Sequence, residues 1–175
     1  MDLIADLRES SLGSRFKRLG ELLYNDYAEL YDFAEVPFKP VWYLILNYFT
    51  RRASGSITEI AAALHVTHAH VTQVADQLIT LQILAEHADP NDRRRRLLRL
   101  TAHGEQQVNR ARPVWEAIRL AQEEIIAESG CDVLEIIERL EQAISRSSVY
   151  ERASGYLEDD GFRARISMSS RPLRR

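Results

Sequence analysis

The stretch from Ser56 to Thr101 constrains the fold of this chain more than any other part of its sequence. It opens with Ser-x-x-Glu, the capping-box pattern of a helix start, and a second helical stretch runs from Thr67 to about Leu81. Two short apolar segments then flank a basic turn that ends in four consecutive arginines. This order predicts a helix-turn-helix followed by a two-stranded wing with a cationic tip, a shape that suits duplex DNA.

The second predicted helix of this stretch has two different faces. Val71, Val74, Ala75 and Leu78 recur at helical spacing and form one apolar stripe. The opposite face carries short hydrogen-bonding side chains instead of the Glu and Lys that usually cover a surface helix, and such a face suits contact with base edges. The candidate DNA contacts on this helix are Thr67, His68, Ala69, His70, Thr72 and Gln73.

Charge is distributed unevenly along the chain, whose formal net charge is −3. Residues 51–104 hold seven Lys and Arg against five Asp and Glu, whereas residues 1–50 and 105–146 are acidic. Contact with phosphate depends on local charge, so the acidic balance of the whole chain does not exclude nucleic acid. The candidate DNA contacts in the basic turn are Arg93, Arg94, Arg95 and Arg96.

Helical periodicity continues on both sides of this stretch. The spacing of apolar residues predicts helices over about 12–33, 41–52, 102–127 and 133–144. Pro37 and Pro40 should break the chain between the first two, the second should be buried nearly all round, and Pro113 should kink the third. These helices carry more apolar surface than one small domain can cover, which predicts a homodimer.

The fold class that follows is mainly α with a small two-stranded wing. Residues 51–104 form the winged helix-turn-helix DNA-binding domain, and residues 1–50 and 105–150 form a helical dimerisation region. Residues 151–175 are a turn-rich tail to which the sequence pattern assigns no fold.

The segment from Asp92 to Gly104 resembles the Asp-x-Arg…Leu-Thr-x-x-Gly signature of MarR-type regulators, and it follows a helix-turn-helix at the distance typical of that family. The resemblance implies a homodimeric, ligand-responsive transcription factor, usually a repressor, that binds a pseudo-palindromic operator. It also implies that Asp92 and Arg94 pair to brace the wing, while Arg93 and Arg95 reach the minor groove. The sequence departs from the family at Gln82, where a glycine is usual, so the turn there should be strained or longer.

Two further segments narrow the resemblance. Leu12 to Leu19 and Ser148 to Arg152 are similar to the MarR half of a subgroup that is fused to an acetyltransferase domain. The family also implies a small aromatic or phenolic effector that binds where the dimerisation helices meet the winged domain. The candidate lining residues are Arg15, Tyr27, Tyr31, Trp42 and Tyr43, with Arg15 or Lys17 as the cation for a carboxylate.

Other functions receive less support. His65, His68 and His70 suggest a metal site, but positions 68 and 70 of a helix point about 200° apart, so we expect neither a metal nor a cofactor. The single cysteine, Cys131, is expected to be an inert turn residue rather than a redox sensor, and it fits a reducing cytoplasm. The apolar runs are too short to span a membrane.

Two function classes remain as alternatives to a sequence-specific regulator. An enzyme is disfavoured because the sequence offers no paired catalytic carboxylates, no glycine-rich phosphate loop and no nucleophile with a base. A winged-helix module that serves protein interaction or DNA architecture, without reading sequence, is the stronger alternative, because winged helices also bind proteins.

Overall fold

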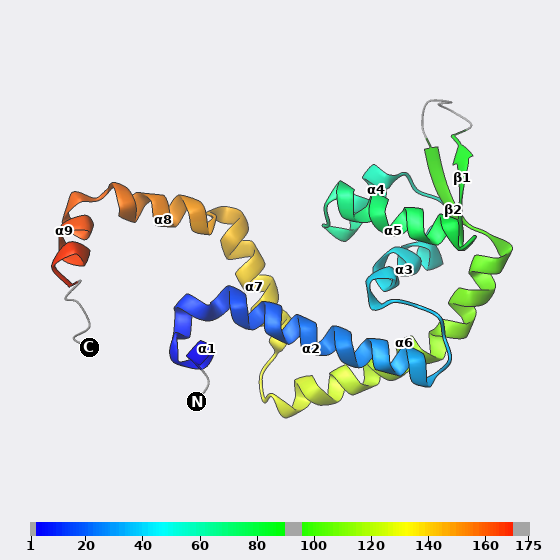
Figure 1. Cartoon of the computed structure of the whole chain (residues 1–175), viewed down its shortest axis with the longest axis horizontal. Coiled ribbons are helices and arrows are strands. Elements are labelled where there is room, and N and C mark those ends of the chain that lie inside the picture. The colour runs from blue at the N-terminus through cyan, green and yellow to red at the C-terminus, as the bar shows by residue number, and fades with distance from the viewer. Residues whose placement is uncertain (1–2, 90–95, 170–175) are drawn as a thin grey trace. The chain divides into compact units, whose positions relative to one another are not determined.

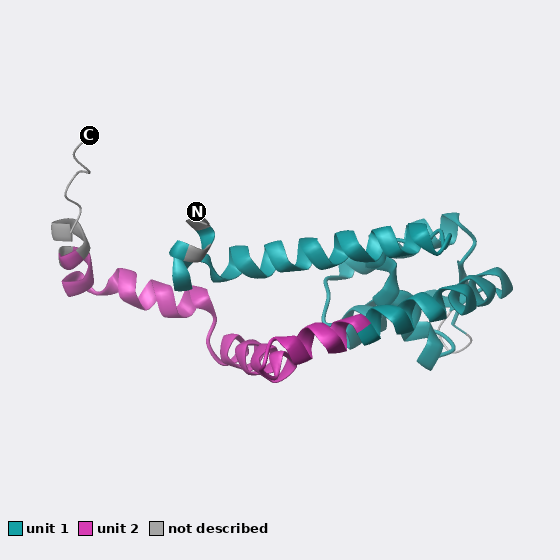
Figure 2. Ribbon diagram, turned by 90° about the horizontal axis from the view of Figure 1, so that it is seen from below, with its two compact units in different colours: residues 1–120 teal, residues 121–175 magenta. Residues whose placement is uncertain are grey.

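The computed structural model describes residues 3–89 and 96–169 of the chain. It divides into two compact units, Met1–Leu120 and Ala121–Arg175, whose boundary falls within a long helix (Figures 1 and 2). The first unit contains α1 (Leu3–Asp6), η1 (Arg8–Ser11), α2 (Leu12–Phe33), η2 (Pro40–Trp42), α3 (Tyr43–Arg51), α4 (Ile57–Leu64), α5 (His68–Thr80), β1 (Leu84–Ala88), β2 (Arg96–Leu100) and most of α6 (Ala102–Glu128). The second contains the end of α6 with α7 (Val133–Arg146), α8 (Val149–Glu158) and α9 (Asp160–Ser169).

The helices predicted on either side of the winged segment are confirmed. The first is α2, whose bounds are those predicted, and the third and fourth are α6 and α7. The second begins as the 3₁₀ turn η2, with Pro40 at its first position, and continues as α3. The prediction that this second helix is buried nearly all round is wrong, because Tyr43 and Leu44 are 36% and 42% exposed. The helix α6 runs through Pro113 from Ala102 to Glu128.

Side-chain caps fix the start of each helix in the helix-turn-helix. The capping box predicted at the start of α4 is confirmed: the Ser56 backbone N–H donates to Glu59 Oε2 at 2.9 Å, and the Glu59 N–H donates to Ser56 Oγ at 3.3 Å. His65 ends this helix in the left-handed conformation, with φ of 52°. Thr67 then caps α5 by accepting the His70 N–H at 3.2 Å. These bonds satisfy orphan N–H groups and set the sharp turn between the two helices.

The wing is a two-stranded antiparallel sheet. The strands β1 and β2 pair in a register that places Leu84 opposite Leu100 and Ala88 opposite Arg96. Gly55, just before α4, adds one bridge to the free edge of β2, where its N–H donates to Leu98 O at 3.1 Å. The wing is therefore tied to the start of the helix-turn-helix as well as to α5.

One apolar core fills the space between these elements of the first unit. The apolar stripe predicted on α5 is confirmed, since Val71, Val74, Ala75 and Leu78 are each at most 2% exposed. The largest fully buried side chains are Tyr31, Ile45, Leu46, Ile60, Leu78, Leu84, Leu98 and Val71. Burial of these side chains from α2 to β2 provides the main driving force for packing of this unit.

The second unit contains two helices in the segment that the sequence analysis described as a tail without a fold. The sequence pattern assigned no fold to residues 151–175, but α8 and α9 cover 149–169, and residues 170–175 lie outside the described part. A second capping box starts α8, with the Ser148 N–H donating to Glu151 Oε2 at 2.8 Å. The Arg152 guanidinium also donates to Ala143 O at 3.1 Å and so caps the end of α7. These local bonds, rather than core burial, stabilise the start of this segment.

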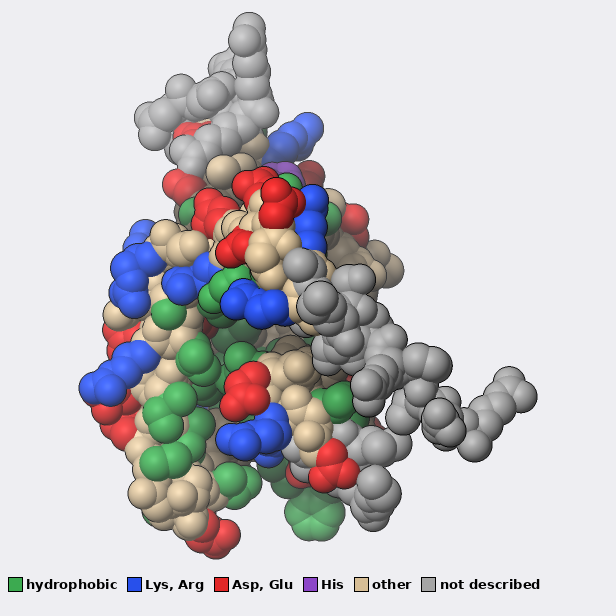
Figure 3. Space-filling model, turned by 90° about the vertical axis from the view of Figure 1, so that its left-hand side faces the viewer, with side chains coloured by type: hydrophobic (Ala, Val, Ile, Leu, Met, Phe, Trp, Pro, Cys, Tyr) green, Lys and Arg blue, Asp and Glu red, His purple; other side chains and the backbone are tan. Residues whose placement is uncertain are grey.

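Large apolar side chains remain exposed on several helices, and Figure 3 shows hydrophobic groups at the surface among charged ones. Those exposed by more than 40% on the longer helices are Leu12, Phe16, Leu19, Leu22, Tyr24 and Phe33 on α2, Leu120 and Ile125 on α6, and Leu134, Ile136 and Ile144 on α7. The helix α7 buries none of its residues. Within the described residues, no helix is both long enough and apolar enough to cross a bilayer.

Candidate nucleic-acid interface

The recognition helix α5 presents the side chains that the sequence analysis selected. Thr67, His68, Ala69 and Gln73 are exposed, and His70 and Thr72 are half-buried. Ala69 and Gln73 lie on the side of the helix opposite to its buried stripe, His70 and Thr72 lie on its flanks, and Thr67 is the N-cap residue that precedes it. The structure therefore leaves all six candidate residues at least partly accessible, and their contact with DNA stays a prediction.

Two polar contacts orient this face. The His68 ring lies with Nε2 3.5 Å from the Thr58 hydroxyl of α4, so the first helix of the motif positions a side chain of the second. The Thr72 hydroxyl donates to the His68 carbonyl at 3.0 Å, which leaves its oxygen lone pairs directed outward as acceptors. Short side chains held in this way allow a helix to approach base edges closely.

Thr101 and Gln82 form the junction between α5, the wing and α6. Gln82 has φ of 57°, so the turn at the predicted departure from glycine is strained. The Thr101 hydroxyl donates to Gln82 O at 2.6 Å and accepts the Gly104 N–H at 2.9 Å. Thr101 thus caps α6, and it also fastens that helix to the residues that follow α5.

The cationic tip of the wing is described only in part. Asp92, Arg93, Arg94 and Arg95 lie outside the described residues, so the predicted Asp92–Arg94 brace stays a prediction. Arg96 is the first residue of β2 and is exposed. Arg99 is exposed on the same strand, opposite Ala85, and the sequence analysis did not select it. Its place between two inward leucines is the signal that could have identified it.

The aromatic residues predicted to line an effector site fall into two groups. Tyr31 and Trp42 are buried and, with Tyr43, belong to a cluster completed by Phe38 and Trp115. In this cluster the Tyr43 and Trp115 rings lie 5.1 Å apart in an edge-to-face arrangement, and the Phe38 and Trp42 rings lie 5.9 Å apart. The Trp115 indole N–H donates to the Tyr31 hydroxyl at 2.8 Å.

The remaining two candidates lie elsewhere on α2. Tyr27 packs against Tyr24, with ring centroids 5.9 Å apart. Arg15 is sixteen residues before Tyr31 on the same helix, a separation of about 24 Å at the rise of an α-helix. Sequence alone could not separate them, because it does not show which part of a long helix adjoins the winged domain.

Burial of Tyr31 makes the stability of the first unit depend on pH. Burial raises the pKa of Tyr31 to about 12; the hydrogen bond from Trp115 lowers it and the nearby Tyr43 raises it. Between pH 10 and 12 the unfolded tyrosine loses its proton while the folded one keeps it, so stability falls as pH rises through this window. We expect Tyr31→Phe to remove roughly 1–2 kcal/mol of this loss, measured by urea unfolding at pH 9 and pH 11.5.

The exposed Tyr150 provides the matched control for that measurement. Its side chain is 80% exposed, so Tyr150→Phe should leave the alkaline loss of stability as in the unsubstituted chain. The assignment to Tyr31 fails if Tyr31→Phe and Tyr150→Phe lose stability equally between the two pH values.

A cavity of about 540 Å³ lies between the loop before α3 and the recognition helix. Its lining residues are Pro37, Lys39, Trp42, Asp76, Gln77, Thr80 and Leu81. The Trp42 indole N–H donates to Gln77 Oε1 of α5 at 3.2 Å, and the Lys39 ammonium lies 5.6 Å from the centre of the Trp42 ring. Lys39, which the sequence analysis did not select, thus brings a cation to the aromatic cluster. Its position between Pro37 and Pro40, three residues before Trp42, was the available signal.

Metal binding finds no added support. The described residues contain no group of three His, Cys, Asp or Glu side chains placed to hold a metal ion. His68 instead approaches Thr58, as described above.

Comparisons with known proteins identify the fold. No protein-family model matches the chain, and no curated protein matches it either. Among solved structures, a mutant MarR from E. coli complexed with operator DNA is 18% identical with a TM-score of 0.63, and the match covers 82% of this chain and 99% of that one. The transcriptional repressor CouR bound to a 23-mer DNA duplex is 22% identical with a TM-score of 0.61, over 79% and 96% of the two chains.

A third solved structure contains a small ligand instead of DNA. NadR in complex with 4-hydroxyphenylacetate is 16% identical with a TM-score of 0.54, and the match covers 81% of this chain and 95% of that one. At these identities the similarity shows the fold. The chain has the winged helix-turn-helix fold of MarR-type regulators, as the sequence analysis predicted.

Proposed function

We propose that this chain is a sequence-specific, homodimeric transcriptional regulator that acts as a repressor at a pseudo-palindromic operator. The observation that carries the proposal is the division of α5 into a buried stripe and an exposed face of short polar side chains. The helix is buried on one side, and its start is held by the Thr67 cap and by the contact between His68 and Thr58, so its exposed side is free to enter a major groove. The DNA-bound CouR and MarR structures share this fold.

Electrostatics supports the same assignment. The wing carries exposed Arg96 and Arg99 on β2, and the adjoining basic turn adds three more arginines in sequence. Arginines at a hairpin tip are suited to phosphate contacts and to a narrow minor groove. We assign contact with the backbone to the wing and contact with base edges to α5.

The dimer rests on the apolar surface left exposed on α2, α6 and α7. Two copies that bury this surface would hold their recognition helices about 34 Å apart, one turn of the double helix. Burial of side chains such as Leu19 and Leu134, which are 52% and 65% exposed, supplies the driving force. We therefore keep residues 1–50 and 105–150 as the dimerisation region and 51–104 as the DNA-binding domain.

A small aromatic or phenolic effector is proposed to act beside Trp42. The cavity there adjoins the aromatic cluster, offers the Lys39 cation, and is lined by Gln77 and Asp76 of α5. A ligand at this place contacts the recognition helix directly, and it shifts DNA binding only to the extent that it prefers one position of that helix. The NadR complex with 4-hydroxyphenylacetate has the same fold.

Two finer assignments rest on sequence. The segments Leu12 to Leu19 and Ser148 to Arg152 support membership of the subgroup that resembles the MarR half of acetyltransferase fusions. A regulator of this kind works in the cytoplasm, and the single cysteine of the chain agrees with that compartment. We assign no enzymatic activity to the chain.

The proposal is tested by selection of binding sites from a random duplex pool with the full chain. We expect enrichment of a two-fold symmetric sequence, bound at least roughly 10³-fold more tightly than scrambled DNA. Equal binding to selected and scrambled duplexes would instead favour the alternative, a winged-helix interaction or architectural module. Sedimentation of the free chain at micromolar concentration tests the dimer separately.

A further inference from the structure

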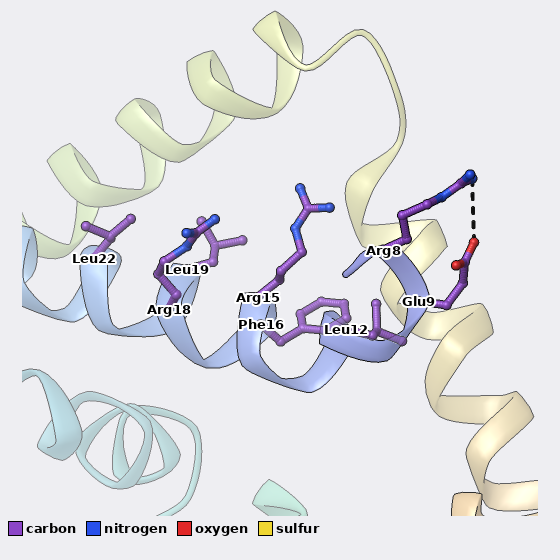
Figure 4. Close-up of a pocket in the computed structure, with 8 residues that line it drawn as sticks. All are labelled: Arg8, Glu9, Leu12, Arg15, Phe16, Arg18, Leu19 and Leu22. Carbon is purple, nitrogen blue, oxygen red and sulfur yellow. Dashed lines mark ion pairs between the residues drawn. The ribbon is translucent and has the colours of Figure 1, made fainter. Parts of the chain in front are cut away.

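A cavity of about 620 Å³ lies at the start of α2, where Arg15, Phe16 and Leu19 are among the residues that line it (Figure 4). Arg15, the residue expected from sequence to serve the aromatic site, therefore lies here instead. The apolar side chains of this cavity belong to the exposed surface that we assign to the dimer, so we assign it no ligand. The cavity beside Trp42 contains none of the exposed apolar residues of α2, α6 and α7.

The cavity beside Trp42 carries two opposite charges on two different elements. Lys39 lies in the segment before η2, and Asp76 lies on α5, close to the end of that helix at Thr80. Both residues line the cavity and both are exposed, so a ligand can reach them from solvent. The cavity thus offers a cation and an anion to the same occupant.

These two charges are not used by the protein itself. Within the described part of the chain, neither side chain makes a hydrogen bond or an ion pair, so the Lys39 ammonium and the Asp76 carboxylate lie more than 4.0 Å apart. The ammonium instead lies 5.6 Å from the centre of the Trp42 ring. An occupant that excludes water from both side chains must bring an anion and a cation, because a desolvated charge without a partner is costly.

The remaining walls of the cavity suit a ligand with an aromatic ring. The Trp42 ring and the Leu81 side chain supply apolar surface, and the volume of about 540 Å³ is within the range of small-molecule sites. Gln77 accepts the Trp42 indole N–H at 3.2 Å and so fixes the position of that ring. The C-terminal end of α5, at Thr80, lies on the same side as Asp76. Its partial negative charge adds to the attraction for a cation there.

We propose that this cavity binds an aromatic amino acid as a zwitterion, with its carboxylate on Lys39, its ammonium on Asp76 and its ring against Trp42. An amino acid carries both charges on one carbon atom, so it satisfies two protein charges that line one small cavity without pairing with each other. The assignment rests on the effector role proposed above, and it narrows the effector to aromatic compounds that also carry an amine. Such a ligand joins the segment before η2 to the recognition helix by two ion pairs.

Titration calorimetry of the full chain with three ligands that share one ring tests the proposal. The ligands are phenylalanine, phenylpropionate, which lacks the ammonium, and phenethylamine, which lacks the carboxylate. We expect phenylalanine to bind at least about tenfold more tightly than either of the other two, because each of them loses one charged contact. Glycine, which has both charges but no ring, should bind at least about tenfold more weakly than phenylalanine as well.

Two substitutions should affect the two partial ligands in opposite ways. Lys39→Met should weaken phenylalanine and phenylpropionate by about tenfold and should not weaken phenethylamine. Asp76→Asn should weaken phenylalanine and phenethylamine by about tenfold and should not weaken phenylpropionate. The ligand that each variant still binds shows that the variant is folded. The matched control is Lys17→Met, because Lys17 pairs with Glu21 at 3.7 Å and does not line the cavity.

Three outcomes would overturn the proposal. If phenylpropionate or phenethylamine binds as tightly as phenylalanine, the effector is aromatic but not a zwitterion. If Lys39→Met and Asp76→Asn bind phenylalanine as tightly as Lys17→Met does, the two charges are solvated and take no part in the site. If none of the three ligands binds, the cavity is not an effector site. Selection of DNA sites is a separate measurement, so each of these results leaves the assignment of the chain as a DNA-binding regulator to its own test.

Discussion

Gly104→Ala is expected to lower the free energy of unfolding by roughly 2–3 kcal/mol. A Cβ at position 104 would overlap the carbonyl oxygen of Ile83, and it would lie 3.0 Å from the Ile83 carbonyl carbon and 3.1 Å from a Leu100 methyl group. The obstacle is backbone that is already bonded, because the same Ile83 oxygen accepts the Thr101 N–H at 3.0 Å. The chain cannot move away without opening the joint between the wing and α6.

Gly20→Ala is the matched control, because it introduces the same methyl group inside a helix. Nothing lies within 4 Å of the Cβ position at Gly20 of α2. Helix propensity alone then applies, and we expect this variant to be more stable by up to about 1 kcal/mol. Urea unfolding at neutral pH measures both variants, and a Gly104→Ala chain as stable as Gly20→Ala would refute the close approach at Ile83.

The elements that sequence predicted well are those whose signals are local. The capping box at Ser56 satisfies a backbone group three residues away, and the apolar stripe of α5 repeats with the period of the helix. The bounds of α2 and the register of burial on α5 therefore agreed with the sequence pattern. The wing motif that resembles MarR-type regulators predicted that two strands follow α5 and that a long helix follows the second strand.

The features that sequence missed depend on contacts across the chain or on weak local signals. Arg15 was assigned to the aromatic site because sequence does not show which part of the long helix α2 adjoins the winged domain. Trp115 joins that site because α6 packs beside α2, and Phe38 joins it because the segment before η2 folds back on Tyr31; no local pattern reveals either contact. The helix α8 begins with the same capping box as α4, Ser148-x-x-Glu151, but its turn-rich surroundings concealed it.

The joint at Thr101 connects the two parts of the proposed interface. Its hydroxyl contacts Gln82 at the end of the recognition helix and caps α6, while its N–H bonds to Ile83 at the start of the wing. A change in the position of α6 is therefore passed to both α5 and the wing through the same hydrogen bonds. In the proposed regulator, this arrangement would link α6 to the DNA-contacting elements through short, direct hydrogen bonds.

Replacement of Arg93 and Arg95 by Ala in both copies is expected to weaken binding to every duplex alike. If each arginine contacts one phosphate, four contacts disappear per dimer, and the slope of log K against log salt becomes shallower by about 3.6. Gln73→Ala should act differently, because the Gln73 amide on the exposed face of α5 is placed to read a base edge. We expect it to cost roughly 1–3 kcal/mol on the selected duplex and little on scrambled DNA.

Fluorescence anisotropy with selected and scrambled duplexes, each titrated at several salt concentrations, distinguishes the two effects. The control variant is Lys17→Met, since that lysine lies on α2, outside the proposed interface, and should change neither slope nor preference. If the Arg93 and Arg95 variant loses binding to the selected duplex but not to scrambled DNA, the wing, and not α5, makes the sequence-specific contacts. Loss of a bidentate contact leaves a base edge unpaired, so it should reduce the preference for the selected over the scrambled duplex. A Gln73→Ala chain that keeps this preference in full would show that Gln73 does not contact a base.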